Sequence, residues 1–304
     1  MCSVSLSAQD LIEEMRQRLT RIGYYRLSAY WYPFRKSVVR NGETVKTDNF
    51  RHGTTWENVI DYYHFDRRVR NMIFEAISRI EIALRAAIAR RWAEDTGLPN
   101  PQGVKNCYRR SYDTFEESLR IVNGNYRKST SDAAQHYRVE KGIKEAKDLP
   151  VWVFVEFSTF GDLNHLLVQG LKLKTQRAIL SEMGFENAEF GINALRLLRV
   201  VRNVCAHQGR VWNRFWETTQ GKPCLHVPVD AGIRSDAGLS VQCGQVDMKR
   251  TALVLVICVH ILSHIAPKSQ WRERLCGLIE RASNPSLYKD LGFLFPNWRS
   301  LLQW

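Results

Sequence analysis

The sequence lacks the features by which several protein classes are recognised. Its seven cysteines include no CxxC pair, and their odd number and scattered spacing argue against both a structural zinc site and a disulfide framework. The chain does not open with a basic segment followed by an apolar core, so no signal peptide is expected. The longest apolar run, from Ala252 to Val259, is far shorter than the ~20 residues of a membrane span. We therefore expect a soluble, cytoplasmic protein.

Other missing motifs restrict the kinds of reaction that the protein could catalyse. No glycine-rich phosphate loop is present, and no Asp or Glu occurs between Phe190 and Trp216, which argues against a two-metal nuclease in this stretch. His260 and His264 are four residues apart, as in a zinc-binding helix, but the Glu of an HExxH motif and an evident third ligand are missing. A buried helix is the simpler interpretation of that pair. We expect neither a metal nor another cofactor.

What the chain does carry is positive charge. Its 304 residues include 44 Lys and Arg against 31 Asp and Glu, a formal net charge of +13. Such an excess favours a polyanionic partner, either nucleic acid or an anionic membrane surface.

The pattern of apolar residues is helical along most of the chain, which predicts an all-α fold. Three-and-four spacing runs from Asp66 to Trp92, and on this stretch Glu81 and Arg85 are placed to pair. The polar segment 38–53 holds two glycines and predicts a loop or a short hairpin, and segment 217–246 predicts a long loop. Further helices are expected over 188–207 with Asn187 as the cap, over 247–265 and over 269–282.

The stretch RVVRNVCAHQGRVWNR, residues 199–214, concentrates arginines around one histidine. At about 100° per residue, Arg199, Asn203 and His207 share one helix face, and Arg202 lies on its flank. Arginine binds phosphate oxygens through a planar fork, and histidine exchanges protons near neutral pH. Because RNA supplies its own nucleophile, the 2′-hydroxyl, these groups suffice for transesterification. The plainer alternatives are a helix-capping histidine and a solvated arginine face, with Cys205 as a core residue.

Four segments together resemble the bacterial abortive-infection family of the AbiD/AbiF type, which is similar to the HEPN superfamily. They are GYYRLSAYWYPFR, DYYHFDRRVRNMIFEAISRIEIALRAAIA, PVWVFVEFSTFGDLNHLL and LRVVRNVCAHQGRVWNR, and they occur in that family's order. The likeness covers roughly residues 8–216. It implies an Abi-type helical domain over 1–216 that contains a HEPN-like helical bundle. Residues 217–304 would form a loop and helical extension packed on the same body.

The resemblance also implies an activity and its residues. HEPN ribonucleases carry an R-x(4–6)-H motif, which Arg202, Asn203 and His207 match here, and they act without metal. The implied protein is an endoribonuclease of phage defence in which His207 is the general acid or base and Arg202 stabilises charge on the scissile phosphate. Asn203 would orient His207 or the phosphate. Glu81 would orient the site from the long helix, although its pairing with Arg85 is the simpler expectation.

Partners follow from the same reasoning, which favours RNA and no membrane. Arg199, Arg210 and Arg214 are candidates for contacts with the RNA backbone. Because only one motif is found and HEPN sites pair two, a homodimer is implied, and an antitoxin could restrain it. Two alternatives remain open, a non-catalytic HEPN-like module that binds RNA, for example a regulatory noncoding one, and a scaffold for another defence protein.

Overall fold

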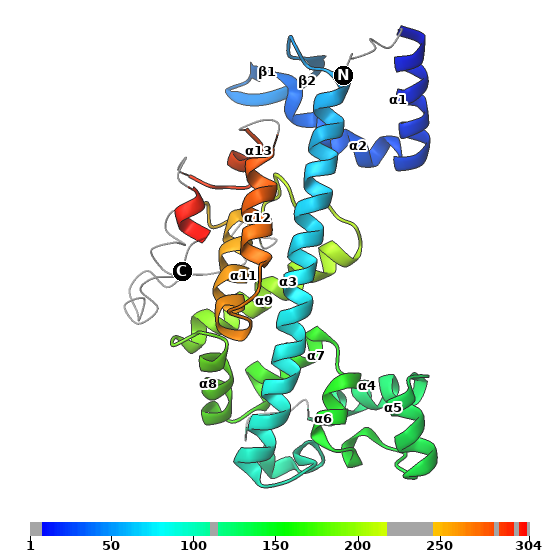
Figure 1. Ribbon diagram of the computed structural model, residues 1–304, viewed down its shortest axis with the longest axis vertical. Helices are drawn as coiled ribbons and strands as arrows, with labels where there is room; N and C mark the ends of the chain where they lie inside the picture. Colours follow the sequence, from blue (N-terminus) through cyan, green and yellow to red (C-terminus); the bar gives the residue numbers. More distant parts are fainter. Residues whose placement is uncertain (1–7, 110–114, 218–245, 283–285, 295–297, 303–304) are drawn as a thin grey trace.

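A single long helix organises the protein, and the other elements are arranged along it in the computed structural model (Figure 1). This helix, α3, spans Trp56–Thr96, and its 41 residues give a length of about 60 Å at 1.5 Å per residue. Thr55 caps its start, because the Thr55 hydroxyl accepts from the Asn58 backbone N–H and the Asn58 side chain accepts from the Thr55 N–H. The helix is therefore ten residues longer at its start than the apolar spacing predicted.

The structure describes residues 8–109, 115–217, 246–282, 286–294 and 298–302. The longer elements are α1 (Ala8–Ile22), α2 (Tyr24–Trp31), β1 (Arg35–Arg40), β2 (Glu43–Phe50), α3, α4 (Phe115–Lys128), α8 (Leu173–Glu182), α9 (Ala188–Ala206), α11 (Thr251–Ile265) and α12 (Trp271–Glu280). The short helices are α5 (Asp132–Gln135), α6 (Val151–Phe154), α7 (Phe160–His165) and α13 (Ser286–Lys289). The predicted all-α class is confirmed, and the predicted loop over 217–246 lies almost wholly outside the described residues.

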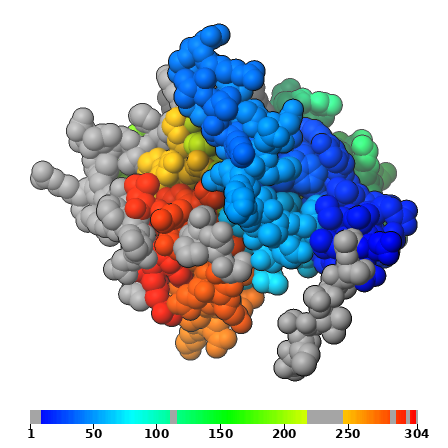
Figure 2. Space-filling view, turned by 90° about the horizontal axis from the view of Figure 1, so that it is seen from above, coloured from blue at the N-terminus to red at the C-terminus, as the bar shows by residue number. Residues whose placement is uncertain are grey.

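The N-terminal end of α3 carries α1, α2 and the hairpin of β1 and β2. Seen from above, the hairpin and α1 project in different directions from this end (Figure 2). The hairpin turns at Asn41 and Gly42, whose φ angles of 52° and 79° suit the tight turn that joins two twisted strands. The loop or hairpin predicted over 38–53 is thus a hairpin.

The helices α4 to α7 lie alongside the opposite half of α3 (Figure 1). α8 lies next to the C-terminal end of α3, where Glu182 contacts Arg90 and Arg91, and α9 lies beside the middle. A π-helical turn, Leu166–Gly170, follows α7 directly. Thr159 caps α7, since its hydroxyl accepts from the Asp162 backbone N–H and the Asp162 carboxylate accepts from the Thr159 N–H. This arrangement brings α7 against α9, which carries the arginine–histidine stretch.

The core is built around α3 and α11. Side chains from Val69 to Trp92 at three-and-four spacing are buried on α3, as the pattern predicted. The apolar run Ala252–Val259 lies on α11 and is buried on all sides, which is typical of a helix at the centre of a core. Among the described helices, none combines the length and apolarity needed to cross a bilayer.

Candidate functional site

The arginine–histidine stretch lies at the end of α9. Asn187 caps the start of this helix, since its side-chain oxygen accepts from the Phe190 N–H at 3.0 Å. The helix ends at Ala206, and His207 is the capping residue, whose N–H donates to the Asn203 carbonyl at 3.0 Å. The start agrees with the prediction, and the end lies one residue before the predicted end at His207. The imidazole therefore lies where a helix passes into a surface loop.

The predicted face of α9 is exposed. Arg199, Asn203 and His207 are all solvent-exposed, whereas Val201 and Cys205 on the other side are buried. Burial raises the pKa of the Cys205 thiol to about 12. At neutral pH Cys205 is therefore a protonated core residue, as expected, and not a nucleophile.

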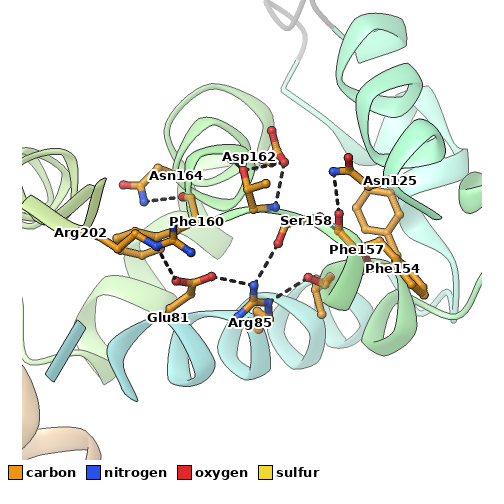
Figure 3. A network of polar contacts seen from close by, with 12 residues as sticks. Glu81, Arg85, Asn125, Phe154, Phe157, Ser158, Phe160, Asp162, Asn164 and Arg202 are labelled. Atoms are coloured by element: carbon orange, nitrogen blue, oxygen red, sulfur yellow. Dashed lines mark hydrogen bonds and ion pairs between the residues drawn. The ribbon is translucent and has the colours of Figure 1, made fainter. Parts of the chain in front are cut away.

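Arg202 is held by a buried carboxylate. Its Nε lies 3.7 Å from Glu81 Oε2, and the other oxygen of Glu81 accepts from Arg85 at 2.7 Å (Figure 3). The Glu81 side chain is 10% exposed and that of Arg202 is 37% exposed. The predicted pair of Glu81 and Arg85 is thus confirmed, and the same carboxylate also contacts Arg202.

Arg85 is fixed in turn by the chain that enters α7. It donates to the backbone carbonyls of Val155 and Ser158, both at 3.1 Å. Figure 3 shows the resulting line of contacts from this segment through Arg85 and Glu81 to Arg202. The contacts limit the freedom of Arg202 on the side that faces α3, while the rest of its guanidinium remains accessible to a ligand.

The loop after His207 is anchored by Asp66, a fully buried residue of α3. Its carboxylate accepts from the backbone N–H groups of Val211 and Trp212 at 2.8 and 2.6 Å, and from Tyr30 and Arg70 at 2.7 Å each. Burial raises the pKa of Asp66, and the hydrogen bonds it accepts oppose that shift. Sequence reasoning missed this role, although Asp66 falls three residues before Val69, on the apolar face of its helix.

Two arginines from other helices hold the turn itself. Gln208 adopts a φ of 58°, a left-handed conformation that is uncommon for a residue with a side chain. Arg26 donates to its carbonyl at 2.7 Å, and Arg70 donates to its side-chain oxygen at 3.2 Å. At Gly209 a Cβ atom would lie 2.8 Å from Val204 Cγ1, so only glycine fits there. The position of His207 is therefore determined by packing on both sides of it.

The predicted RNA contacts differ in their surroundings. Arg199 is exposed, whereas Arg210 donates to the Ala29 carbonyl at 2.7 Å, and burial lowers the pKa of Arg210. Arg214 lies over the Trp216 ring, with its guanidinium carbon 4.9 Å from the ring centroid. The structure thus brings Arg199, Asn203 and His207 together on one exposed face, with Arg202 on its flank against Glu81. Arg210 and Arg214 are placed in contacts within the protein.

The histidine pair on α11 serves the fold. His260 is buried, and its Nε2 lies 2.8 Å from the Gly184 carbonyl, while His264 Nδ1 lies 2.9 Å from the His260 carbonyl. Across the described ranges, no cluster of three or more His, Cys, Asp or Glu is placed to hold a metal ion. The helix that carries the pair is buried up to Leu262, as interpreted, whereas His264 near its end is exposed.

These residues define a helical protein that exposes an arginine–histidine face beside a buried carboxylate. A family model described as Abi-like protein matches residues 17–213, from α1 to the loop anchored by Asp66. The chain therefore belongs to the Abi-like protein family, and this membership supports a general role in abortive infection, the defence of bacteria against phage. Comparison with curated proteins and with solved structures yields no match.

Proposed function

We propose that the protein is a metal-independent endoribonuclease that acts in abortive infection. The observation that carries the proposal is the exposure of His207 and Asn203 on one face of α9, next to an Arg202 held in place by Glu81. The protein would be an AbiD/AbiF-like member of the HEPN superfamily. Its R-x4-H motif and the order of its four sequence blocks support that assignment.

The proposed reaction uses the RNA's own hydroxyl. The 2′-oxygen attacks the adjacent phosphorus as an imidazole takes its proton, and the bond from phosphorus to the 5′-oxygen breaks. The leaving oxygen takes a proton, so the products are a 2′,3′-cyclic phosphate and a 5′-hydroxyl. Arg202 would stabilise the charge that develops on the phosphate oxygens, and Asn203 would orient the phosphate or the imidazole.

One imidazole can serve as base and a second as acid. Since the chain carries a single motif, the proposed site is composite and joins His207 of two copies in a homodimer. Cleavage of RNA by such a dimer would halt the growth of an infected cell. An antitoxin would then restrain the protein before infection.

The test replaces His207 with alanine. We expect His207→Ala to abolish RNA cleavage and growth arrest and to change RNA affinity by no more than a few-fold, because the arginines remain. The measurements are cleavage of end-labelled RNA in the presence of EDTA, analysis of the product termini, and RNA binding. The matched control is His52→Ala, which removes another exposed histidine, in the loop before α3.

Two results would contradict the proposal. One is cleavage that persists in His207→Ala, and the other is wild-type cleavage that depends on Mg²⁺. A wild-type protein that binds RNA tightly without cutting it would instead support the alternative, a non-catalytic RNA-binding module.

A further inference from the structure

A polar cavity lies beside the arginine face, between α9 and the segment formed by α7 and its π-helical turn. Its volume is about 170 Å³, and its polar lining consists of Asn164, His165, Gln169, Arg196 and Arg199. An engineered cavity of about 150 Å³ in another protein binds benzene. This one is therefore large enough for a single aromatic ring, and its polar lining suits a ring or sugar that carries hydrogen-bonding groups.

Asn164 belongs to this lining and carries an unsatisfied acceptor. The residue is only 3% exposed, and its Nδ2 donates to the Phe160 carbonyl at 2.8 Å. Its Oδ1 is buried and has no hydrogen-bond partner among the described residues. Leaving a buried acceptor unpaired is costly, so such an atom calls for an explanation. A ligand that donates an N–H or O–H group would supply the missing partner by displacing the atoms that now cover Oδ1, since that oxygen has almost no accessible surface.

Two guanidinium groups accompany this acceptor. Arg196 and Arg199 are exposed and lie three residues apart, about 4.5 Å along the helix axis. Within the described part of the chain, Arg199 makes no hydrogen bond or ion pair, and Arg196 makes one long hydrogen bond of 3.4 Å to Asn193. Phosphate is an anion that such a pair of guanidinium groups binds in bidentate fashion. The ligand thus needs an anionic group and, separately, a hydrogen-bond donor.

We propose that this cavity binds one ribonucleotide, whose base or ribose donates to Asn164 Oδ1 while its phosphate lies on Arg196 and Arg199. Inorganic phosphate alone would leave Asn164 unsatisfied, which is why a nucleotide is the better fit. The nucleotide is either free or part of an RNA chain. In the second case the inference rests on the proposed function, because Arg202 follows Arg199 by one turn and a bound strand would continue from the cavity toward His207.

The first experiment measures binding to the full-length His207→Ala protein, so that no result depends on cleavage. The probes are AMP, CMP, GMP and UMP, with inorganic phosphate for comparison, and the method is calorimetry. We expect at least one mononucleotide to bind at least tenfold more tightly than phosphate. Adding Asn164→Leu, which removes the acceptor, should weaken that binding at least tenfold, while the control Asn71→Leu, on the exposed surface of α3, should leave it unchanged.

A second variant keeps the inference testable if Asn164→Leu fails to fold. Arg199→Gln changes an exposed side chain that the fold does not use, and it should also weaken mononucleotide binding at least tenfold. Equal binding of phosphate and mononucleotides, or mononucleotide binding that neither variant changes, would overturn the inference.

The second experiment distinguishes the two sources of the nucleotide in the protein with His207 intact. If the nucleotide belongs to the RNA substrate, mononucleotides compete with RNA, and Asn164→Leu raises KM and alters the base preference beside the cut. If it is a free regulator, mononucleotides change the cleavage rate without competing. Loss of cleavage in every protein tested would contradict the proposed function and leave the binding result standing. If the protein cleaves RNA but binds no mononucleotide, the inference about the cavity is wrong and the proposed function stands.

Discussion

At the scale of single residues, Glu81 connects the fold to the proposed chemistry. It is one buried carboxylate shared between Arg85, which binds the backbone before α7, and Arg202, which belongs to the motif. A carboxylate in this position opposes the repulsion between the two guanidinium groups and fixes the direction of Arg202. We therefore regard Glu81 as a positioning residue.

The corresponding prediction concerns Glu81→Gln. Glutamine keeps the shape and a hydrogen-bond acceptor but removes the charge, so Arg202 should lose its alignment toward the scissile phosphate. We expect kcat for RNA cleavage to fall about tenfold, equivalent to ~1.4 kcal/mol of transition-state stabilisation, with KM changed less than twofold. The measurement is steady-state kinetics on a labelled RNA.

The control for this substitution is Glu75→Gln, which removes a surface partner of Arg274 elsewhere on α3. It should leave both kinetic constants unchanged. Because Arg85 loses its charged partner in Glu81→Gln, the assay is run well below the midpoint of thermal unfolding. An unchanged kcat in a folded Glu81→Gln protein would show that Glu81 serves the fold alone.

At the scale of elements, local sequence signals predicted much of what surrounds the site. The i,i+4 spacing predicted the pair of Glu81 and Arg85, and Asn187 predicted the start of α9, because both depend on neighbours within a turn of helix. The contact of Glu81 with Arg202 spans separate helices and was not predicted, although the resemblance implied an orienting role for Glu81. The cavity at Asn164 and Arg199 was missed, since it exists only when α7 packs on α9.

The hydrogen bonds around Asp66, here called the Asp66 cluster, connect separate elements and were not predicted from the sequence. It joins α2 through Tyr30, α3 through Arg70 and the loop after α9 through two backbone N–H groups. We predict that Asp66→Ala lowers the free energy of unfolding by about 3–5 kcal/mol, because Arg70 is left as an uncompensated buried charge. The measurement is urea denaturation followed by circular dichroism.

The matched control is Asp48→Ala, which removes a carboxylate that is 98% exposed and pairs with Arg35 on the hairpin. An exposed pair of this kind contributes at most about 1 kcal/mol. If the two substitutions destabilised the protein equally, the buried cluster would not be the anchor described here.

At the scale of the whole molecule, the net charge of +13 makes the affinity for RNA depend on salt concentration. Binding through phosphates releases counterions, so affinity falls with salt, with a slope of about −0.7 per neutralised phosphate of a single strand. We predict that Arg199→Gln makes this slope about 0.7 less steep, since Arg199 is exposed and unpaired among the described residues. The measurement is RNA binding to the His207→Ala protein across a range of salt concentrations.

Arg210→Gln provides the comparison, because Arg210 donates to the Ala29 carbonyl. It should alter the salt slope less than Arg199→Gln and should lower stability instead. A larger change in slope for Arg210→Gln would show that Arg210, and not Arg199, is the stronger of these two predicted contacts with the RNA backbone.

The continuity of α3 determines which mutations between Asp66 and Glu81 the protein can tolerate. Asp66 and Glu81 both belong to this helix, one anchoring the loop after the motif and the other the arginine within it. Their separation is set by helix geometry alone, at about 22 Å for fifteen residues. Inserting or deleting one residue between them would rotate one anchor by about 100° relative to the other. Substitutions can therefore accumulate along this interval, whereas changes in its length cannot.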